Sequence, residues 1–143
     1  MNVKEILAAK GGDIVSIEPS ATLSAAAALL SARRIGSLVI RGAGGRLAGI
    51  LSERDIVRAI VEHGADALAL PVAQVMTRNV MTCGENDTVA DIMEWMTARK
   101  FRHLPVVNEG RLVGLISIGD VVKQRVEECE RESEAMRDYI RSA

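Results

Sequence analysis

The sequence predicts a mixed α/β (α+β) fold in which two tandem β-α-β-β-α repeats pack as one pseudo-two-fold module, followed by a long C-terminal helix. Two observations carry this prediction: an internal repeat, and the same order of strand and helix patterns in each copy. Apolar residues make up 48% of the chain and aromatic residues only 2%, so the core must be aliphatic. Neither copy can bury its apolar sheet face alone, and we therefore expect the two to pack together.

The repeat rests on ten matching positions in each half of the chain. The first copy contributes Thr22, Ala32, Arg33, Leu38, Gly45, Arg46, Leu47, Gly49, Ser52 and Asp55, and the second contributes Thr88, Ala98, Arg99, Leu104, Gly110, Arg111, Leu112, Gly114, Ser117 and Asp120. The early pairs are 66 residues apart and the late pairs 65 apart, so the second copy lacks one residue. The missing residue falls in an expected hairpin turn, where changes of length are tolerated.

Each copy shows the same order of expected elements. The first has a strand at 13–17, a helix from the cap Thr22 to Arg34, strands at 37–41 and 47–51 joined by a glycine turn, and a helix from the cap Ser52 to about His63. The second has strands at 80–82, 103–107 and 112–116, with helices at 88–100 and from about 118. Thr and Ser suit the N-cap because their oxygens accept a hydrogen bond from an unpaired helix N–H. Glycine suits the turn because it adopts positive φ at no steric cost.

We divide the chain into repeat 1 with a short N-terminal helix (1–64), a connector (65–79), repeat 2 (80–125) and a C-terminal helical extension (126–143). The helical spacing of Val3, Ile6 and Leu7 predicts that the N-terminal helix packs on a sheet edge. The final helix carries a heptad-like stripe of Val122, Val126, Cys129, Ser133, Met136 and Ile140. The stripe is shorter than the roughly 3–4 heptads that indicate a coiled coil from sequence alone, and Ser133 weakens its centre. It therefore fits either a helix lying on its own domain or a dimer contact.

Charge and composition exclude several classes of function. With 18 basic and 19 acidic residues the formal net charge is −1, which does not suit binding to nucleic acid. The chain has neither a membrane-spanning apolar run nor a signal-peptide pattern, so we expect no membrane association and a cytoplasmic location. Cys83 and Cys129 share no metal-ligand spacing with His63 or His103. We therefore expect no metal site, and two thiols that are buried or half-buried.

The most informative motif is a Ser-x-x-Asp unit that opens a helix in each copy, Ser52 to Asp55 and Ser117 to Asp120. Such a unit forms an N-terminal capping box. A helix N-terminus with a hydroxyl also suits a phosphate, and a nearby carboxylate can bind the hydroxyls of a ribose. Two units at equivalent places in a repeat therefore indicate either two caps or two nucleotide-binding positions.

These segments resemble the CBS repeats named after cystathionine β-synthase. The resemblance is carried by residues 35–40 (IGSLVI), 47–55 (LAGILSERD), 101–107 (FRHLPVV) and 112–120 (LVGLISIGD), and it extends over about residues 3–125. The length and the long final helix are similar to those of small stand-alone bacterial CBS-pair proteins. The resemblance implies two pseudo-symmetric sites in a cleft between the repeats, with AMP as the first candidate ligand and ADP, ATP, related adenosyl compounds or NAD(H) as others.

The resemblance also implies which residues line each site. One site would use Asp120 for the ribose, Ser117, Arg102 and His103 for the phosphate, and Ile14, Ile35, Gly36 and Ser37 for the base. The other would use Asp55 for the ribose, Ser52 and Arg54 for the phosphate, and Thr77, Val80, Phe101 and Arg102 for the base. Because Gly36-Ser37 stands where the second repeat has Arg102-His103, the two sites should not bind equally. His103 could instead be a structural histidine at a strand start.

No catalytic machinery is visible in the sequence. The chain lacks a P-loop motif, and its glycines at 42, 44 and 45 join two expected strands rather than a strand and a helix. We therefore expect a non-enzymatic regulatory sensor of adenine nucleotides without a catalytic cofactor. The main alternative is a structural or interaction scaffold in which the Ser-x-x-Asp units only cap helices; an enzyme acting on a nucleotide is a weaker one. A homodimer is expected, and the target protein is unknown.

Overall fold

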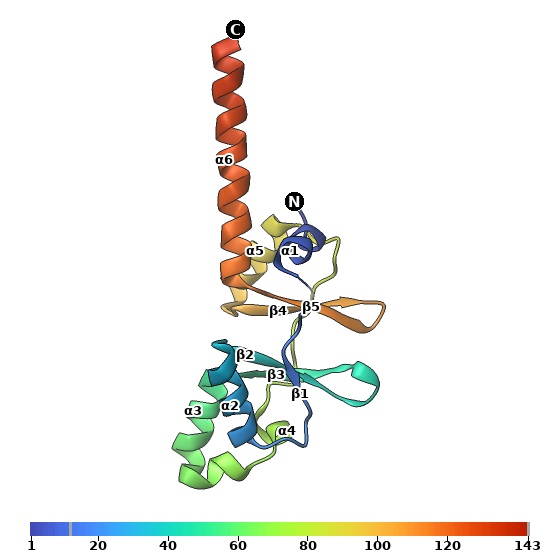
Figure 1. The fold of residues 1–143 in the computed structure, drawn as a ribbon, viewed down its shortest axis with the longest axis vertical. Helices are drawn as coiled ribbons and strands as arrows, with labels where there is room; N and C mark the ends of the chain where they lie inside the picture. The colour runs from blue at the N-terminus through green and yellow to red at the C-terminus, as the bar shows by residue number, and fades with distance from the viewer. Residues whose placement is uncertain (12, 143) are drawn as a thin grey trace.

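The computed structural model describes residues 1–11 and 13–142, and it has the predicted mixed architecture. In chain order the elements are α1 (Val3–Lys10), β1 (Ser16–Ile17), α2 (Leu23–Arg33), β2 (Ser37–Arg41), the 3-10 helix η1 (Ala43–Gly45), β3 (Leu47–Ser52), α3 (Glu53–His63), the 3-10 helix η2 (Gly64–Ala69), α4 (Val72–Val75), α5 (Val89–Arg99), β4 (His103–Asn108), β5 (Arg111–Ser117) and α6 (Ile118–Ser142). The two repeats lie one above the other, with their sheets toward the middle and most helices outside (Figure 1).

The sheets are smaller than predicted. In repeat 1, β1 pairs parallel to β2, and β2 pairs antiparallel to β3; in repeat 2 the sheet consists of β4 and β5. The strand expected at 80–82 does not form, and the nearby pairing is an isolated parallel bridge between Cys83 and Val106. The chain turns away directly afterwards, because the Gly84 N–H donates to Asp87 Oδ2 at 2.7 Å.

Each repeat has its own aliphatic core. The helix before repeat 1, α1, completes the core of repeat 2, and the helix before repeat 2, α4, completes the core of repeat 1. Sequence order groups the N-terminal helix with repeat 1 and predicts that it lies on a sheet edge, but in the structure Val3 and Ile6 of α1 are buried in the core of repeat 2. Conversely, Val72 of α4 is buried in the core of repeat 1. The backbone fixes both crossings, since Val3 N–H donates to Asp87 O at 3.0 Å and Val72 N–H to Ala21 O at 2.7 Å.

The crossing segments approach the sheets closely at two equivalent glycines. A Cβ on Gly49 would lie 2.6 Å from the backbone oxygen of Thr77, and one on Gly114 would lie 2.5 Å from a methyl carbon of Leu7. Thr77 is held in place by two backbone hydrogen bonds with Ile50, at 2.9 and 3.0 Å. Each glycine therefore lets a helix-bearing segment contact the sheet of the opposite repeat.

We expect Gly49→Ala to lower the free energy of unfolding more than Gly114→Ala, within the about 1–3 kcal/mol that overpacking usually costs. At Gly49 a backbone would have to move, whereas at Gly114 the Leu7 side chain can change its rotamer. Urea unfolding of both variants measures the difference. A larger loss for Gly114→Ala would contradict this reading of the two crossings.

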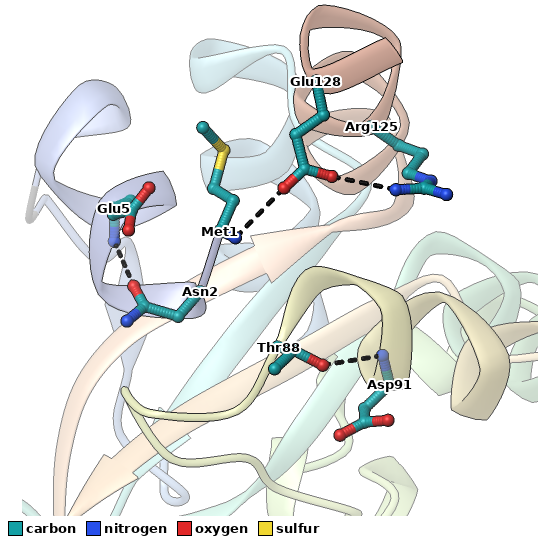
Figure 2. Close-up of polar contacts among 7 residues, drawn as sticks. All are labelled: Met1, Asn2, Glu5, Thr88, Asp91, Arg125 and Glu128. Carbon is teal, nitrogen blue, oxygen red and sulfur yellow. Dashed lines mark hydrogen bonds and ion pairs between the residues drawn. The ribbon is translucent and has the colours of Figure 1, made fainter. Parts of the chain in front are cut away.

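Hydrogen-bonded caps begin several helices, and a separate ion pair connects the start of the chain to α6. The predicted caps are confirmed: Thr22 Oγ1 accepts from Ala25 N and Thr88 Oγ1 from Asp91 N, both at 3.1 Å. The amine of Met1 lies 3.1 Å from Glu128 Oε1, whose second oxygen accepts from Arg125 Nη1 at 3.1 Å (Figure 2). These contacts hold the first part of α6 against repeat 2.

The thiols differ from one another. Cys83 is buried, and burial, with a smaller contribution from Asp87, raises its pKa to about 12. Cys129 lies exposed on α6, so the expectation of two buried or half-buried thiols was wrong for this residue. The reason is that α6 continues beyond the body of the repeat (Figure 1), and residues 129–142 are exposed. Among residues 1–11 and 13–142, no helix is long and apolar enough to cross a membrane.

Candidate functional site

A cavity of about 420 Å³ lies where the two repeats meet. Its size falls within the range of about 300–1,000 Å³ that is usual for small-molecule sites. Repeat 1 contributes the end of β3 and the start of α3, while the connector and the loop before β4 supply the facing wall. The lining residues are Gly36, Ile50, Ser52, Glu53, Arg54, Asp55, Thr77, Asn79, Val80, Met81, Arg99, Lys100, Phe101, Arg102 and His103.

The cavity brings together nine of the fourteen residues singled out from the sequence. It holds the whole set assigned to the Asp55 site, namely Ser52, Arg54, Asp55, Thr77, Val80, Phe101 and Arg102, together with Gly36 and His103. The lining does not include Ile14, Ile35, Ser37, Ser117 or Asp120. The structure therefore gathers one of the two expected residue sets around a single cavity.

At the Asp55 position the Ser-x-x-Asp unit forms a complete capping box. Ser52 N–H donates to Asp55 Oδ2 at 2.9 Å, and Asp55 N–H donates to Ser52 Oγ at 3.3 Å. The other carboxylate oxygen, Oδ1, lies 3.6 Å from Arg58 Nη1. Asp55 thus caps α3 and also lines the cavity, so capping does not by itself remove the carboxylate from a ligand's reach.

At the equivalent position in repeat 2 the same box forms, but a lysine joins it. Ser117 N–H donates to Asp120 Oδ2 at 2.9 Å, and Asp120 N–H donates to Ser117 Oγ at 3.2 Å. Lys10 Nζ, at the end of α1, lies 2.7 Å from the same Oδ2 and 2.8 Å from Leu115 O. Burial raises the pKa of Asp120, but the hydrogen bonds from Lys10 and Ser117 outweigh it and leave the pKa below its ordinary value.

Gly36, Arg102 and His103, which were assigned to the Asp120 site, line the cavity, but the three apolar or hydroxyl residues expected around the nucleotide base lie apart from it. Ser37 is 4% exposed within β2, and its Oγ finds no hydrogen-bond partner in the described part of the chain. Ile35 lines a separate hollow between α2 and α3, and Ile14 lies half-buried before β1. Together with the engagement of Asp120 by Lys10, this dispersal makes the two pseudo-symmetric positions unequal.

Basic side chains are concentrated on one side of the cavity, and sequence reasoning missed two of them. Arg99 and Lys100 join Arg102 in the lining, where they end α5 and lead into β4. Lys100 has a left-handed backbone with φ 57°, and Arg34, 66 residues earlier, has φ 54° at the same helix end. A basic pair at the end of the first helix in both copies was the signal that could have identified them.

His103 lies at the start of β4, half-buried in the cavity wall. Burial lowers its pKa most, and the Lys10 and Arg102 cations lower it further against the opposing effect of Asp120 and Glu53. The imidazole is therefore mainly neutral at pH 7. A ligand anion placed beside it would favour its protonation.

Comparison with known proteins identifies both repeats. The family model described as "CBS domain" matches residues 3–62 and 72–127. A CBS-domain containing protein of Agrobacterium tumefaciens, of known crystal structure, is 46% identical with a TM-score of 0.83, covering 87% of this chain and 92% of that one. The CBS domain pair of the protein MJ0100, solved in complex with 5-methylthioadenosine and S-adenosyl-L-methionine, is 26% identical with a TM-score of 0.78, covering 90% and 98%.

Curated relatives are longer than the matched region. An uncharacterized 17.7 kDa protein of Acidianus ambivalens is 35% identical over 108 residues, which are 75% of this chain and 64% of the relative. The mitochondrial CBS domain-containing protein CBSX3 of Arabidopsis thaliana is 33% identical over 115 residues, or 78% and 56%. The chain thus spans less than two thirds of these relatives. Because the family model matches most of the chain in two successive segments, the chain belongs to the CBS domain family.

Proposed function

We propose that this CBS pair is a non-catalytic regulatory module that binds an adenine nucleotide in the cavity between its repeats, with AMP as the first candidate and ATP or NAD(H) as alternatives. The observation that carries the proposal is the convergence, around one cavity, of the capped N-terminus of α3 and the basic loop before β4. The MJ0100 pair supports the ligand class, since it was solved with two adenosyl compounds.

Each part of a nucleotide has a chemically suitable counterpart in the lining. The start of α3 lies in the lining and offers the positive end of the helix dipole to a phosphate, and Arg54, Lys100 and Arg102 add positive charge. The carboxylate of Asp55 suits the ribose hydroxyls. Val80, Phe101 and Ile50 offer apolar contact for a flat base.

The competing proposal is a scaffold without a ligand. It is favoured by the two capping boxes, because both Ser-x-x-Asp units have a structural role regardless of any nucleotide. The ultraviolet spectrum of the purified protein, followed by chromatography of heat-released small molecules, separates the two. With one Trp and one Tyr, the chain has little absorbance of its own to mask bound adenine. Release of an adenine nucleotide supports the sensor, and the scaffold predicts none.

We further propose that Lys10 keeps the Asp120 position from binding as the Asp55 position does. Lys10→Met should therefore free the Asp120 carboxylate and strengthen nucleotide binding at this position. Charge-assisted hydrogen bonds are worth about 1.5–3 kcal/mol, so affinity at the Asp120 position should rise about 10- to 150-fold. Calorimetric stoichiometry measures it, with Lys4→Met on the exposed part of the same helix as the control. Unchanged stoichiometry, or weaker binding, would show that Lys10 does not guard this position.

We expect nucleotide binding to take up a proton through His103. Its pKa in the unliganded protein is lowered, and a phosphate beside it would raise that pKa. Affinity should then increase as pH falls through the raised pKa of the complex, and level off below the pKa of the unliganded state. Calorimetry near pH 6 in buffers of different ionisation enthalpy measures the uptake. His103→Gln should abolish the proton uptake that does not come from the nucleotide phosphate itself. Equal proton uptake in the wild type and the variant would make His103 a structural residue.

The regulatory module is proposed to act as a homodimer. Val57 and Val61 on α3 are exposed, and so are Val122 and Val126 at the equivalent places on α6, 65 residues later. α3 and α6 lie along the same side of the molecule in Figure 1, so the four valines suit one extended contact with a second copy. The cytoplasmic location stays a prediction from the sequence, and the regulated target protein is unknown.

A further inference from the structure

The outer face of α6 is an apolar stripe that its own repeat does not cover. The helix docks on repeat 2 through the opposite face, where Val121 and Gln124 are buried. The stripe residues Val122, Val126, Met136 and Ile140 are 41%, 49%, 63% and 68% exposed. Cys129 and Ser133, which complete the stripe, are exposed as well. The structure thus contradicts the reading in which the stripe lies on its own domain.

We propose that the α6 helices of two copies form a parallel, two-stranded coiled coil that extends the dimer beyond the repeats. The inference rests on the homodimer proposed above, but not on nucleotide binding. In heptad terms Val126, Ser133 and Ile140 occupy a positions, and Val122, Cys129 and Met136 occupy d positions. β-Branched residues at a favour two parallel strands, and a polar residue at one a position helps to fix the register.

The flanking charges select the parallel orientation. In a parallel pair each g residue faces the e residue five places further along the partner. This places Arg125 opposite Glu130 of the partner subunit, and Glu132 opposite the partner subunit's Arg137, so each contact is attractive and occurs twice. The pair between Arg125 and Glu128 within one chain is a surface i,i+3 contact. Such contacts are weak, and Arg125 can exchange this partner for another.

The antiparallel orientation has the opposite electrostatics. In the antiparallel register that covers the whole stripe, e residues face e residues and g residues face g residues. Glu130 would then meet Glu130 of the partner subunit, and Glu132 would meet Glu132 of the partner subunit. Lys123 would meet the partner subunit's Arg137. All of these contacts are repulsive, and like charges placed opposite one another disfavour that pairing.

The direction of α6 agrees with this choice. The helix leaves repeat 2 on the side away from repeat 1 and continues in that direction to the C-terminal end (Figure 1). Two copies that met head to tail through their repeats would send their α6 ends in opposite directions, leaving both stripes uncovered. A head-to-head arrangement places α3 beside α3 and α6 beside α6, so that one interface covers the valines and the stripe together.

Zero-length thiol cross-linking of the full chain tests the orientation. In the parallel coil the two Cys129 side chains face each other at a d position. In the antiparallel register Cys129 faces Ser133, so the two cysteines are offset by four residues, or about 6 Å along the axis. Each Cα lies about 2.3 Å from its helix axis, so facing Cα atoms of two helices whose axes are about 8–10 Å apart are about 3.5–5.5 Å apart, and a disulfide can join them in the parallel coil. In the antiparallel register the axial offset raises the separation to about 7–8 Å, beyond the usual disulfide range of about 4.4–6.8 Å. Copper-phenanthroline serves as the catalyst, and dissolved oxygen accepts the two electrons and two protons released by the thiols.

Three proteins make the experiment decisive: wild type, Met136→Cys in a Cys129→Ser background, and Arg131→Cys in the same background. Residue 136 is a second d position, whereas residue 131 lies on the outer face of the coil. We expect covalent dimer from the first two roughly 100-fold faster than from the third, because paired thiols have a millimolar effective concentration. A dimer by sedimentation that cross-links at neither d position, or equally fast at position 131, overturns the parallel coil. A monomer at tens of micromolar overturns the homodimer as well.

Discussion

Replacing Asp55 with alanine should weaken the binding of AMP about 10- to 150-fold. The carboxylate lines the cavity and is only 8% exposed, so charge-assisted hydrogen bonds from a ribose to it would be well shielded from water. Such bonds are worth about 1.5–3 kcal/mol, which corresponds to that range of affinity. Calorimetric titration of the variant measures the loss.

The matched control is Asp120→Ala, which removes the equivalent carboxylate and capping box in repeat 2. Both variants should lose about 0.5–2 kcal/mol of stability through the lost cap. Only Asp55→Ala should lose nucleotide affinity, because Asp120 lies outside the cavity lining and pairs with Lys10. If Asp55→Ala melts at a lower temperature yet binds as tightly as wild type, then Asp55 is a cap and not a ribose ligand.

Replacing Met136 and Ile140 together with glutamate should weaken the homodimer at least about 100-fold. Each substitution places a charge in an apolar contact, and burial of an unpaired polar group costs about 1–3 kcal/mol or more. Sedimentation equilibrium measures the dissociation constant. Because both residues are exposed in the single chain, we expect no loss of its fold.

The control for this pair is Arg131→Glu with Arg141→Glu, which adds more negative charge to the same helix but outside the stripe. This variant should dimerise nearly as wild type does. A Met136→Glu, Ile140→Glu protein that stays fully dimeric would confine the interface to the repeats and leave the end of α6 without a role in assembly.

Local patterns in the sequence predicted the elements that local chemistry determines. Thr22 and Thr88 begin helices as expected, and the long final helix is present because its charged and apolar residues keep a helical period. The expected strand at 80–82 did not form, because pairing depends on a partner and only Cys83, next to the turn at Gly84, bridges to β4.

Contacts between distant parts of the chain could not be predicted in the same way. The burial of α1 in repeat 2 follows from where the chain crosses, and nothing in the spacing of Val3 and Ile6 specifies which sheet they meet. For the same reason the pairing of Lys10 with Asp120, which lie 110 residues apart, carried no sequence signal. The difference between Gly36-Ser37 and Arg102-His103 predicted that the Asp55 and Asp120 positions would be unequal. The pairing of Lys10 with Asp120 adds a second cause.

Calorimetric titration of the nucleotide-stripped protein with AMP, ADP, ATP and NAD(H) is the most direct measurement. If the cavity between the repeats is a nucleotide site, at least one of these ligands should bind with one molecule per chain, and the affinity should fall about 10- to 150-fold in Asp55→Ala and be retained in Asp120→Ala. If none of the four binds to the folded dimer at tens of micromolar, or if binding survives in Asp55→Ala unchanged, the proposal of an adenine-nucleotide sensor is contradicted.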